Sequence, residues 1–312
     1  MAASQTLLPR FPLSTAPAGL PTWLPTLRAY SGFRVQEAKS DGEHETLGRI
    51  GSLEISLATK ARHVRLAQKL RYQVFYDEMS AARHPAAAFW RRDVDHFDSI
   101  CDHLVVFDRD ARRAYPGREP VAVGTYRLLR QDVAERHGGF YTAGEYGVGE
   151  LLARHRGLRF LELGRSCVLA PYRDRRTVEL LWHGIWTYVR RHRIDAMIGC
   201  ASFDGINADK LALPLAFLHH HAQAPADWRV RALAPRYVEM NRLPKKAISA
   251  AAAMRALPPL IRGYLRLGAF VGEGAVVDRK FGTTDVFVAL PVSAINQKYI
   301  EYFGPAAERY AA

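Results

Sequence analysis

The sequence predicts an α/β fold in which one mixed sheet is flanked by helices. Three observations support this class. Short apolar runs typical of strands recur along the chain, and two longer segments, at about 61–79 and 174–192, have the apolar spacing of amphipathic helices. These elements follow one another as strand, helix, three strands, helix, strand, helix and further strands, without an internal repeat.

Each element in the first half of the chain follows from a local pattern. Residues 53–57 alternate between apolar and polar side chains, which predicts a strand. The helix over 61–79 has an apolar face made of Val64, Ala67, Leu70 and Val74. Three further apolar runs predict strands at 102–108, 121–130 and 158–169.

The second half continues the same alternation. The helix over 174–192 has an apolar face made of Val178, Leu181, Ile185 and Tyr188. A short apolar strand is predicted at 194–200, and a helix interrupted by Pro214 at 206–220. The remaining strand-like segments are 228–233, 275–278 and 285–290.

The composition divides the chain into one large domain and two tails. Five prolines in the first 25 positions and the lack of periodicity predict a disordered tail over residues 1–45. We expect the folded domain at 46–303, in which 245–303 is a C-terminal extension packed on the rest. Residues 304–312 are expected to form a short tail.

The net charge predicts an anionic partner. Lys and Arg total 44 against 31 Asp and Glu, a net charge of +13. Nucleic acid, an anionic membrane surface and an acidic protein are all compatible with this charge. A nucleic-acid-binding protein would have aromatic residues interleaved with surface Lys and Arg, whereas the aromatic residues here lie mostly in apolar runs. We therefore expect no nucleic-acid partner.

The sequence also gives expectations for the compartment. It contains no run of 18 apolar residues, so we expect no membrane-spanning helix. Cys101, Cys167 and Cys200 are far apart, which predicts free thiols in a reducing cytoplasm. The apolar segment 258–272 carries Arg262 and Arg266 and has two interpretations: a core element, or a peripheral contact with the inner face of the cytoplasmic membrane.

Charged residues next to apolar strands are the strongest indication of a site. In the strand 121–130, Arg127 shares a face with apolar neighbours, and an unpaired arginine there would be costly. Asp95 and Asp98 are its expected partners. Two interpretations remain open: a purely structural ion-pair network, or the charged wall of a cleft that also orients substrate.

The strand 158–169 carries the candidate general base. Glu162 and Ser166 share a face by alternation, while Arg165 points the other way. A β-bulge at Gly164 would bring Arg165 round toward Glu162. A carboxylate whose pKa is raised by burial could accept a proton from an amine. The alternative for Glu162 is an ion pair with Arg165 or Arg71.

Next along the chain, a helix begins with several basic residues. Its first residues include Arg173, Arg175, Arg176 and Thr177. The N-terminus of a helix favours anions, because its backbone N–H groups are unpaired and its dipole is positive there. These residues therefore predict a phosphate site, the alternative being a solvated basic surface.

Together these motifs resemble the acyl-homoserine-lactone synthases and their relatives in the GNAT superfamily. The matching residues are Arg71 with Phe75, Asp95 with Asp98, Arg127 in a Gly-x-x-Arg-Leu strand, and Glu162 with Arg165. The later segments Cys200-Ala-Ser-Phe, Leu218-His-His-His and Phe281-Gly-Thr-Thr-Asp-Val make the chain more similar to the ornithine N-acyltransferases, over about residues 50–303.

The resemblance implies a GNAT-like, mostly antiparallel sheet and a site that moves a fatty acyl group from a thioester to an amine. It implies Glu162 as catalytic base and Arg71, Asp95, Asp98, Arg127, Arg165 and Ser166 as substrate-binding residues. Acyl carrier protein and L-ornithine are the implied partners, with no cofactor and no metal. Alternative functions are lactone synthesis and acylation of another amino acid.

One departure from the GNAT pattern indicates acyl carrier protein as the acyl donor. GNAT enzymes grip coenzyme A with a loop that usually contains two glycines, but Asp174 and Arg176 occupy those positions here. The resemblance therefore implies that Arg173, Arg175, Arg176 and Thr177 meet the single phosphate of a carrier-bound phosphopantetheine arm.

Overall fold

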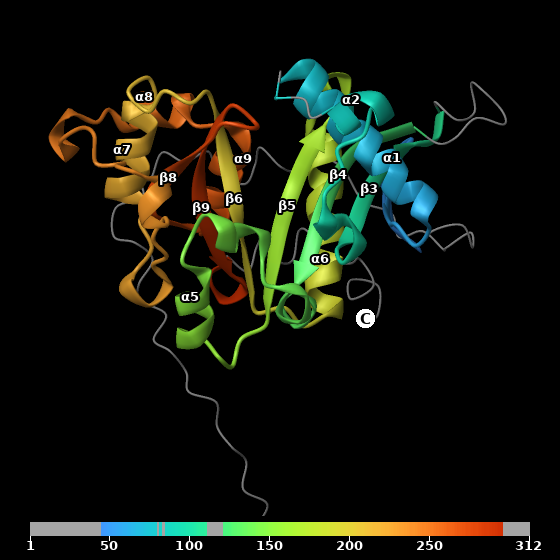
Figure 1. The fold of residues 1–312 in the computed structure, drawn as a ribbon, viewed down its shortest axis with the longest axis horizontal. Coiled ribbons are helices and arrows are strands. Elements are labelled where there is room, and N and C mark those ends of the chain that lie inside the picture. Colours follow the sequence, from blue (N-terminus) through green and yellow to red (C-terminus); the bar gives the residue numbers. More distant parts are fainter. Residues whose placement is uncertain (1–44, 80, 83–84, 111–120, 296–312) are drawn as a thin grey trace, which may run out of the picture.

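The computed structural model of the chain describes residues 45–79, 81–82, 85–110 and 121–295. Within these ranges a nine-stranded sheet forms the centre of the fold (Figure 1). Its strands are β1 (Glu45–Ile50), β2 (Leu53–Leu57), β3 (Asp102–Asp108), β4 (Val121–Arg130), β5 (Phe160–Val168), β6 (Ala196–Asp204), β7 (Tyr237–Val238), β8 (Phe270–Asp278) and β9 (Thr283–Pro291). The α-helices are α1 (Ala61–Tyr72), α2 (Pro85–Trp90), α4 (Gln131–Ala134), α5 (Val148–Arg154), α6 (Arg175–Arg191), α7 (Ala212–His221), α8 (Ala250–Ala256) and α9 (Pro259–Leu267).

The sheet is mixed but mostly antiparallel, as predicted. Its order is β1-β2-β3-β4-β5-β6-β9-β8-β7. Only the central pair β5–β6 is parallel within the described part of the sheet. The helix α6 connects these two strands, which is the usual way to join parallel neighbours.

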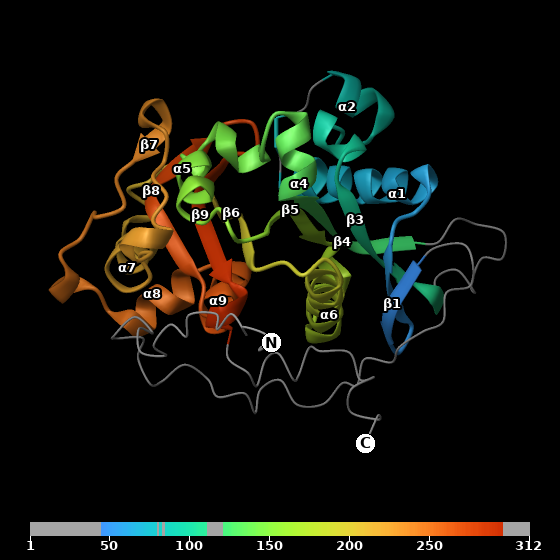
Figure 2. The same cartoon turned by 90° about the horizontal axis from the view of Figure 1, so that it is seen from below.

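Helices cover both faces of the first half of the sheet, and the side chains of β3 alternate between these two faces. Leu104 and Val106 pack into the core that contains α6, whereas Val105 and Phe107 pack with α1. Figure 2 shows α1 and α6 on opposite sides of the strands. Both faces of β3 are therefore buried, which explains its continuous apolar sequence.

Several sequence-based predictions differ from the structure. Residues 45–50 form β1, which we did not predict, and the segment 258–272 is divided between α9 and the start of β8. The segment 228–233, predicted as a strand, holds only isolated bridges, and the helix predicted at 206–220 begins at Ala212. The expected extension at 245–303 supplies β8 and β9 to the central sheet, so its described part is an integral layer of the domain. The tail at 1–45 lies, except for Glu45, outside the described residues, as do 296–303 of the extension and the tail at 304–312.

The parallel strands β5 and β6 form a fork at the middle of the sheet. They pair only over 160–162 and 196–198, although both strands continue well beyond that point. Gly199 lies at the fork, where a Cβ atom would be only 2.4 Å from the carbonyl oxygen of Leu163. The absence of a side chain at Gly199 therefore permits the close approach of the two strands just before they separate.

Candidate active site

A cavity of about 1050 Å³ lies at this fork. The separated parts of β5 and β6 form its walls together with α6, α9 and the π-helix η2 (Gln73–Glu78) that continues α1. One part of the lining is apolar and includes Val74, Phe75, Leu181, Trp182 and Leu260. The cavity is large enough to enclose much of a fatty chain, since substrate pockets commonly measure about 300–1,000 Å³.

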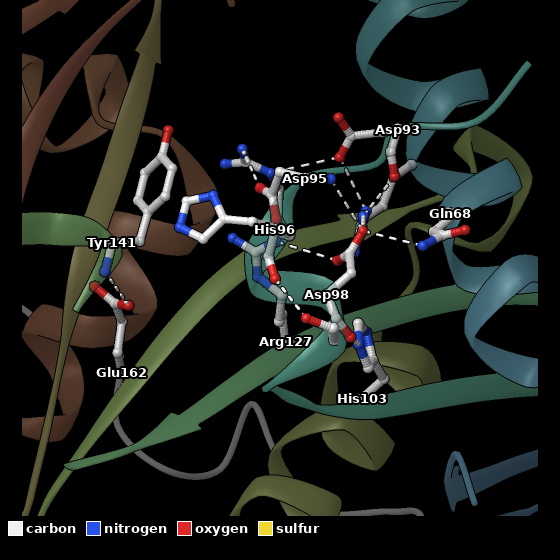
Figure 3. Close-up of polar contacts among 12 residues, drawn as sticks. Gln68, Asp93, Asp95, His96, Asp98, His103, Arg127, Tyr141 and Glu162 are labelled. Carbon is white, nitrogen blue, oxygen red and sulfur yellow. Dashed lines mark hydrogen bonds and ion pairs between the residues drawn. The ribbon is translucent and has the colours of Figure 1, made fainter. Parts of the chain in front are cut away.

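Glu162 lines the cavity at the base of the fork. Its side chain is only 4% exposed. One carboxylate oxygen accepts the backbone N–H of Thr142 at 2.7 Å and the Thr142 hydroxyl. The other accepts the backbone N–H of Tyr141 at 2.9 Å (Figure 3). Burial raises the pKa of Glu162 above its ordinary value, although these hydrogen bonds oppose the shift. Backbone donors rather than an arginine thus hold this carboxylate.

Arg71 on α1 is the centre of a buried ion-pair network. Its guanidinium donates to both oxygens of Asp98, at 2.9 and 2.7 Å, and lies 3.0 Å from a carboxylate oxygen of Asp93. Arg71 is fully buried. Burial by itself would raise the pKa of Asp98, but the hydrogen bond and charge of Arg71, with the charge of Arg127, lower it below its ordinary value.

Arg127 and Arg165 extend this network toward the cavity. Arg127 donates to Asp95 at 2.6 Å and to Asp98 at 3.2 Å, while Arg165 donates to Asp95 at 3.1 Å (Figure 3). Both arginines line the cavity, and the Arg165 guanidinium lies 4.7 Å from the centre of the Tyr141 ring. Arg71, Asp95, Asp98, Arg127 and Arg165 thus form one assembly that joins α1, β4 and β5.

The expected bulge on β5 is present, but it orients Arg165 differently from the prediction. Two residues, Arg165 and Ser166, lie opposite one residue of β4, and Arg165 has a left-handed φ of 50°. Its side chain pairs with Asp93 and Asp95, not with Glu162. The physical reason is that the Arg165 guanidinium reaches two carboxylates, Asp93 and Asp95, whereas the carboxylate of Glu162 already accepts hydrogen bonds from residues 141 and 142.

Asp93 is the functional residue that the sequence reasoning missed. It is 1% exposed, contacts Arg71 and Arg165, and accepts a hydrogen bond from the Tyr76 hydroxyl at 3.1 Å. The signal was present as a third acid in the run Asp93-Val-Asp95-His-Phe-Asp98. Three buried arginines in the assembly need at least this number of acids for balance.

The basic residues at the start of α6 lie at or near the cavity. Arg173 and Arg175 line it, whereas Arg176 is outside its lining. Each is ion-paired: Arg173 with Glu78, Arg175 with Glu179 at 2.6 Å, and Arg176 with Asp174 at 2.9 Å.

Asp174 occupies the N-terminus of α6 itself. Its carboxylate accepts the backbone N–H of Thr177 at 3.0 Å and the Thr177 hydroxyl at 3.2 Å, so it caps the helix. Thr177 is fully buried, and both of its donors are used within the protein. A phosphate at this end of the cavity would therefore meet arginine side chains rather than Thr177.

Ser166 and α9 complete the lining described here. Ser166 follows Arg165 in the bulge and faces the cavity from β5. The helix α9 buries Ile261, Tyr264 and Leu265, and it lines the cavity with Leu260 and Arg262. This helix is therefore a core element and a cavity wall, which was one of the two interpretations of 258–272.

Two further features bear on cofactors and location. Carboxylate oxygens of Glu145, Asp278 and Asp285 lie within 4.8 Å of one another, close enough to share a cation. The three cysteines are free thiols. Over the described ranges, every helix is too short or too polar to cross a bilayer.

Residues 70–183 match the acetyltransferase (GNAT) domain family, so the forked, mostly antiparallel sheet belongs to the GNAT class of acyltransferases. The chain is 51% identical to an L-ornithine N(alpha)-acyltransferase from Brucella abortus, over 90% of this chain and 99% of that protein. It is 54% identical to the enzyme of the same name from Agrobacterium fabrum, over 84% and 88% of the two chains. The chain therefore belongs to the L-ornithine N(alpha)-acyltransferase family.

Solved structures show a more distant likeness. An N-acyl amino acid synthase from uncultured soil microbes aligns with 80% of this chain and 97% of its own, at 11% identity and a TM-score of 0.43. A coenzyme-A-dependent acyl-homoserine lactone synthase aligns with 78% of this chain and 83% of its own, at 15% identity and a TM-score of 0.42.

Proposed function

We propose that this protein transfers a long-chain acyl group, 3-hydroxylated in its preferred form, from acyl carrier protein to the α-amine of L-ornithine, which gives lyso-ornithine lipid. The observation that carries the proposal is Glu162, a buried carboxylate of raised pKa at the fork of β5 and β6, inside a cavity with an apolar wall. Membership of the L-ornithine N(alpha)-acyltransferase family supports ornithine as the acceptor.

In this scheme Glu162 takes a proton from the α-ammonium of the acceptor, directly or through one water. The free amine attacks the thioester carbonyl carbon, a C–N bond forms, and the C–S bond breaks. The departing sulfur is protonated and leaves as the thiol of the carrier. Beyond Glu162 and Ile198, β5 no longer pairs with β6. The backbone N–H groups on that edge of β5 can stabilise the developing oxyanion, as acyl transfer requires.

The arginines near the start of α6 support acyl carrier protein as the donor. Asp174 caps the helix, so a phosphate there would meet the arginine side chains rather than the capped N-terminus. The side chains of Arg173, Arg175 and Arg176 remain partly exposed, between 34% and 49%. They can meet the single phosphate of a phosphopantetheine arm and the acidic surface of the carrier.

A peripheral contact with anionic lipid remains part of the proposal, and flotation with phosphatidylglycerol vesicles tests it.

The test is acyl transfer by the purified protein. Acyl carrier protein charged with 3-hydroxylated or unsubstituted acyl chains is mixed with ornithine or with other amines, including S-adenosylmethionine, and products are identified by mass spectrometry. We expect the acylated ornithine as the main product, and Glu162→Gln to reduce turnover by at least about 100-fold, the usual size of a general-base effect. Glu150→Gln removes an exposed carboxylate and is the control. Unchanged turnover in Glu162→Gln would exclude Glu162 as the base.

A further inference from the structure

A second polar feature of the cavity lies apart from the arginine network. It is the acidic cluster of Glu145, Asp278 and Asp285, in which one carboxylate oxygen from each residue lies within 4.8 Å of the other two. All three residues are buried, at 3%, 8% and 7% exposed. Glu145 comes from the segment before α5, whereas Asp278 and Asp285 come from the adjacent strands β8 and β9. Folding therefore brings three acids together out of water.

The acidic cluster has fewer cationic partners than charges. Arg236 pairs with Glu145 at 3.3 Å, and one oxygen of Asp278 accepts the backbone N–H groups of Lys280 and Phe281. Oδ1 of Asp285 is buried and has no hydrogen-bond partner. Over the part of the chain that the structure describes, neither Asp278 nor Asp285 forms an ion pair. An unpaired buried carboxylate is costly, so this arrangement favours a cation supplied from outside.

Two of the three acids face the same cavity as the base. Asp278 and Asp285 line that cavity, together with the half-buried Cys200 and Glu162. Burial raises the pKa of Asp285, and the charge of Asp278 adds to the effect, while the side chains of Ser202 and Thr283 and the charge of Arg165 lower it. A bound cation would also lower this pKa and so favour the ionised carboxylate.

Contacts through Cys200 link the acidic cluster to the base. The sulfur of Cys200 lies 3.4 Å from Glu145 and 3.9 Å from the hydroxyl of Thr142, and that hydroxyl donates to Glu162. Three contacts therefore lead from Glu145 to the base. An extended ornithine places its two nitrogens about 6 Å apart, by ordinary bond lengths.

We propose that Glu145, Asp278 and Asp285 bind the side-chain ammonium of the acceptor, while its α-amine lies at Glu162. This inference rests on the proposed function and adds the determinant of acceptor choice. An ammonium is a compact charge with three donors, which suits three converging carboxylates. An acceptor without this ammonium would leave the three acids unpaired, and a site with buried unpaired polar groups strongly rejects such a substrate.

The experiment compares ornithine with norvaline, which has the same carbon skeleton but no side-chain amine. In the wild-type protein we expect kcat/KM for ornithine to exceed that for norvaline by at least 100-fold. Asp285→Asn should reduce this ratio at least tenfold, mainly through a higher KM for ornithine. Asp278→Asn is the second variant, and Asp132→Asn, which changes an exposed acid outside the cavity lining, is the control. Circular dichroism and the thermal midpoint confirm that each variant is folded.

The outcomes separate this inference from the proposed function. Equal use of ornithine and norvaline by the wild-type protein, or a ratio unchanged in both folded variants, overturns the inference and leaves acyl transfer intact. Failure to acylate ornithine at all overturns both. Activity that is lost with a chelator and restored by Mg²⁺ or Mn²⁺ in the wild type but not in Asp285→Asn identifies a metal site, which also overturns the inference.

Discussion

Replacing Arg71 by methionine tests the buried ion-pair network most directly. Methionine keeps much of the volume of the side chain but removes its charge. The substitution deletes hydrogen bonds of 2.9 and 2.7 Å to Asp98 and a 3.0 Å ionic contact with Asp93, at a residue that is fully buried. Breaking one partner of a buried pair costs about 3–5 kcal/mol, because the remaining charge is left in a poor solvent.

Arg127 and Arg165 limit the loss, since each still contacts one of the two acids. We therefore expect the free energy of unfolding to fall by about 3 kcal/mol, the lower end of that range. Urea unfolding followed by tryptophan fluorescence measures it, and the midpoint should shift by about 1 M at an m-value of about 3 kcal/mol/M.

The control is Arg91→Gln. Arg91 lies 2.7 Å from Asp77, the same distance as the contact between Arg71 and Asp98, but its side chain is 69% exposed. An exposed pair contributes at most about 1 kcal/mol. If Arg71→Met destabilises the protein no more than Arg91→Gln, burial does not govern the energy of this network and the reasoning is wrong.

Three further predictions concern the fork, acid stability and the base. Gly199→Ala should lower the free energy of unfolding by about 1–3 kcal/mol, because the new Cβ would lie 2.4 Å from the carbonyl oxygen of Leu163. In the control Gly164→Ala the new Cβ meets no atom within 4 Å, so the thermal midpoint should fall much less. Equal effects of the two substitutions would contradict this prediction. The pKa of Asp98 is lower in the folded protein, so its contribution to stability is present above its ordinary pKa of 3.8 and is lost as the pH falls below it. Acid titration should therefore show a shallower decline in Asp98→Asn, and an unchanged slope would refute the assignment. The pKa of Glu162 in the free protein is raised above 4.5, so kcat/KM should fall on the acid side at a pH above that value. An acid limb of kcat/KM at or below 4.5 would exclude Glu162 as its source.

Local sequence patterns predicted most of the elements that build the site. The alternation in 121–130 placed Arg127 among apolar neighbours, and the structure pairs it with Asp95 and Asp98 as expected. These predictions succeed because strand periodicity and the cost of an unpaired buried charge are properties of short segments and single groups. The bulge near Gly164 was implied by the resemblance to the GNAT superfamily, and a glycine in a strand is compatible with such an irregularity.

Tertiary structure decided the other charge pairings of the site. Arg165 was expected near Glu162, but the fold places Asp93 and Asp95 within its reach and gives Glu162 the backbone N–H groups of residues 141 and 142. The acidic cluster of Glu145, Asp278 and Asp285 was also invisible in the sequence, because its members are up to 140 positions apart. Such contacts depend on strand order and on where β5 leaves β6, and no local pattern encodes either.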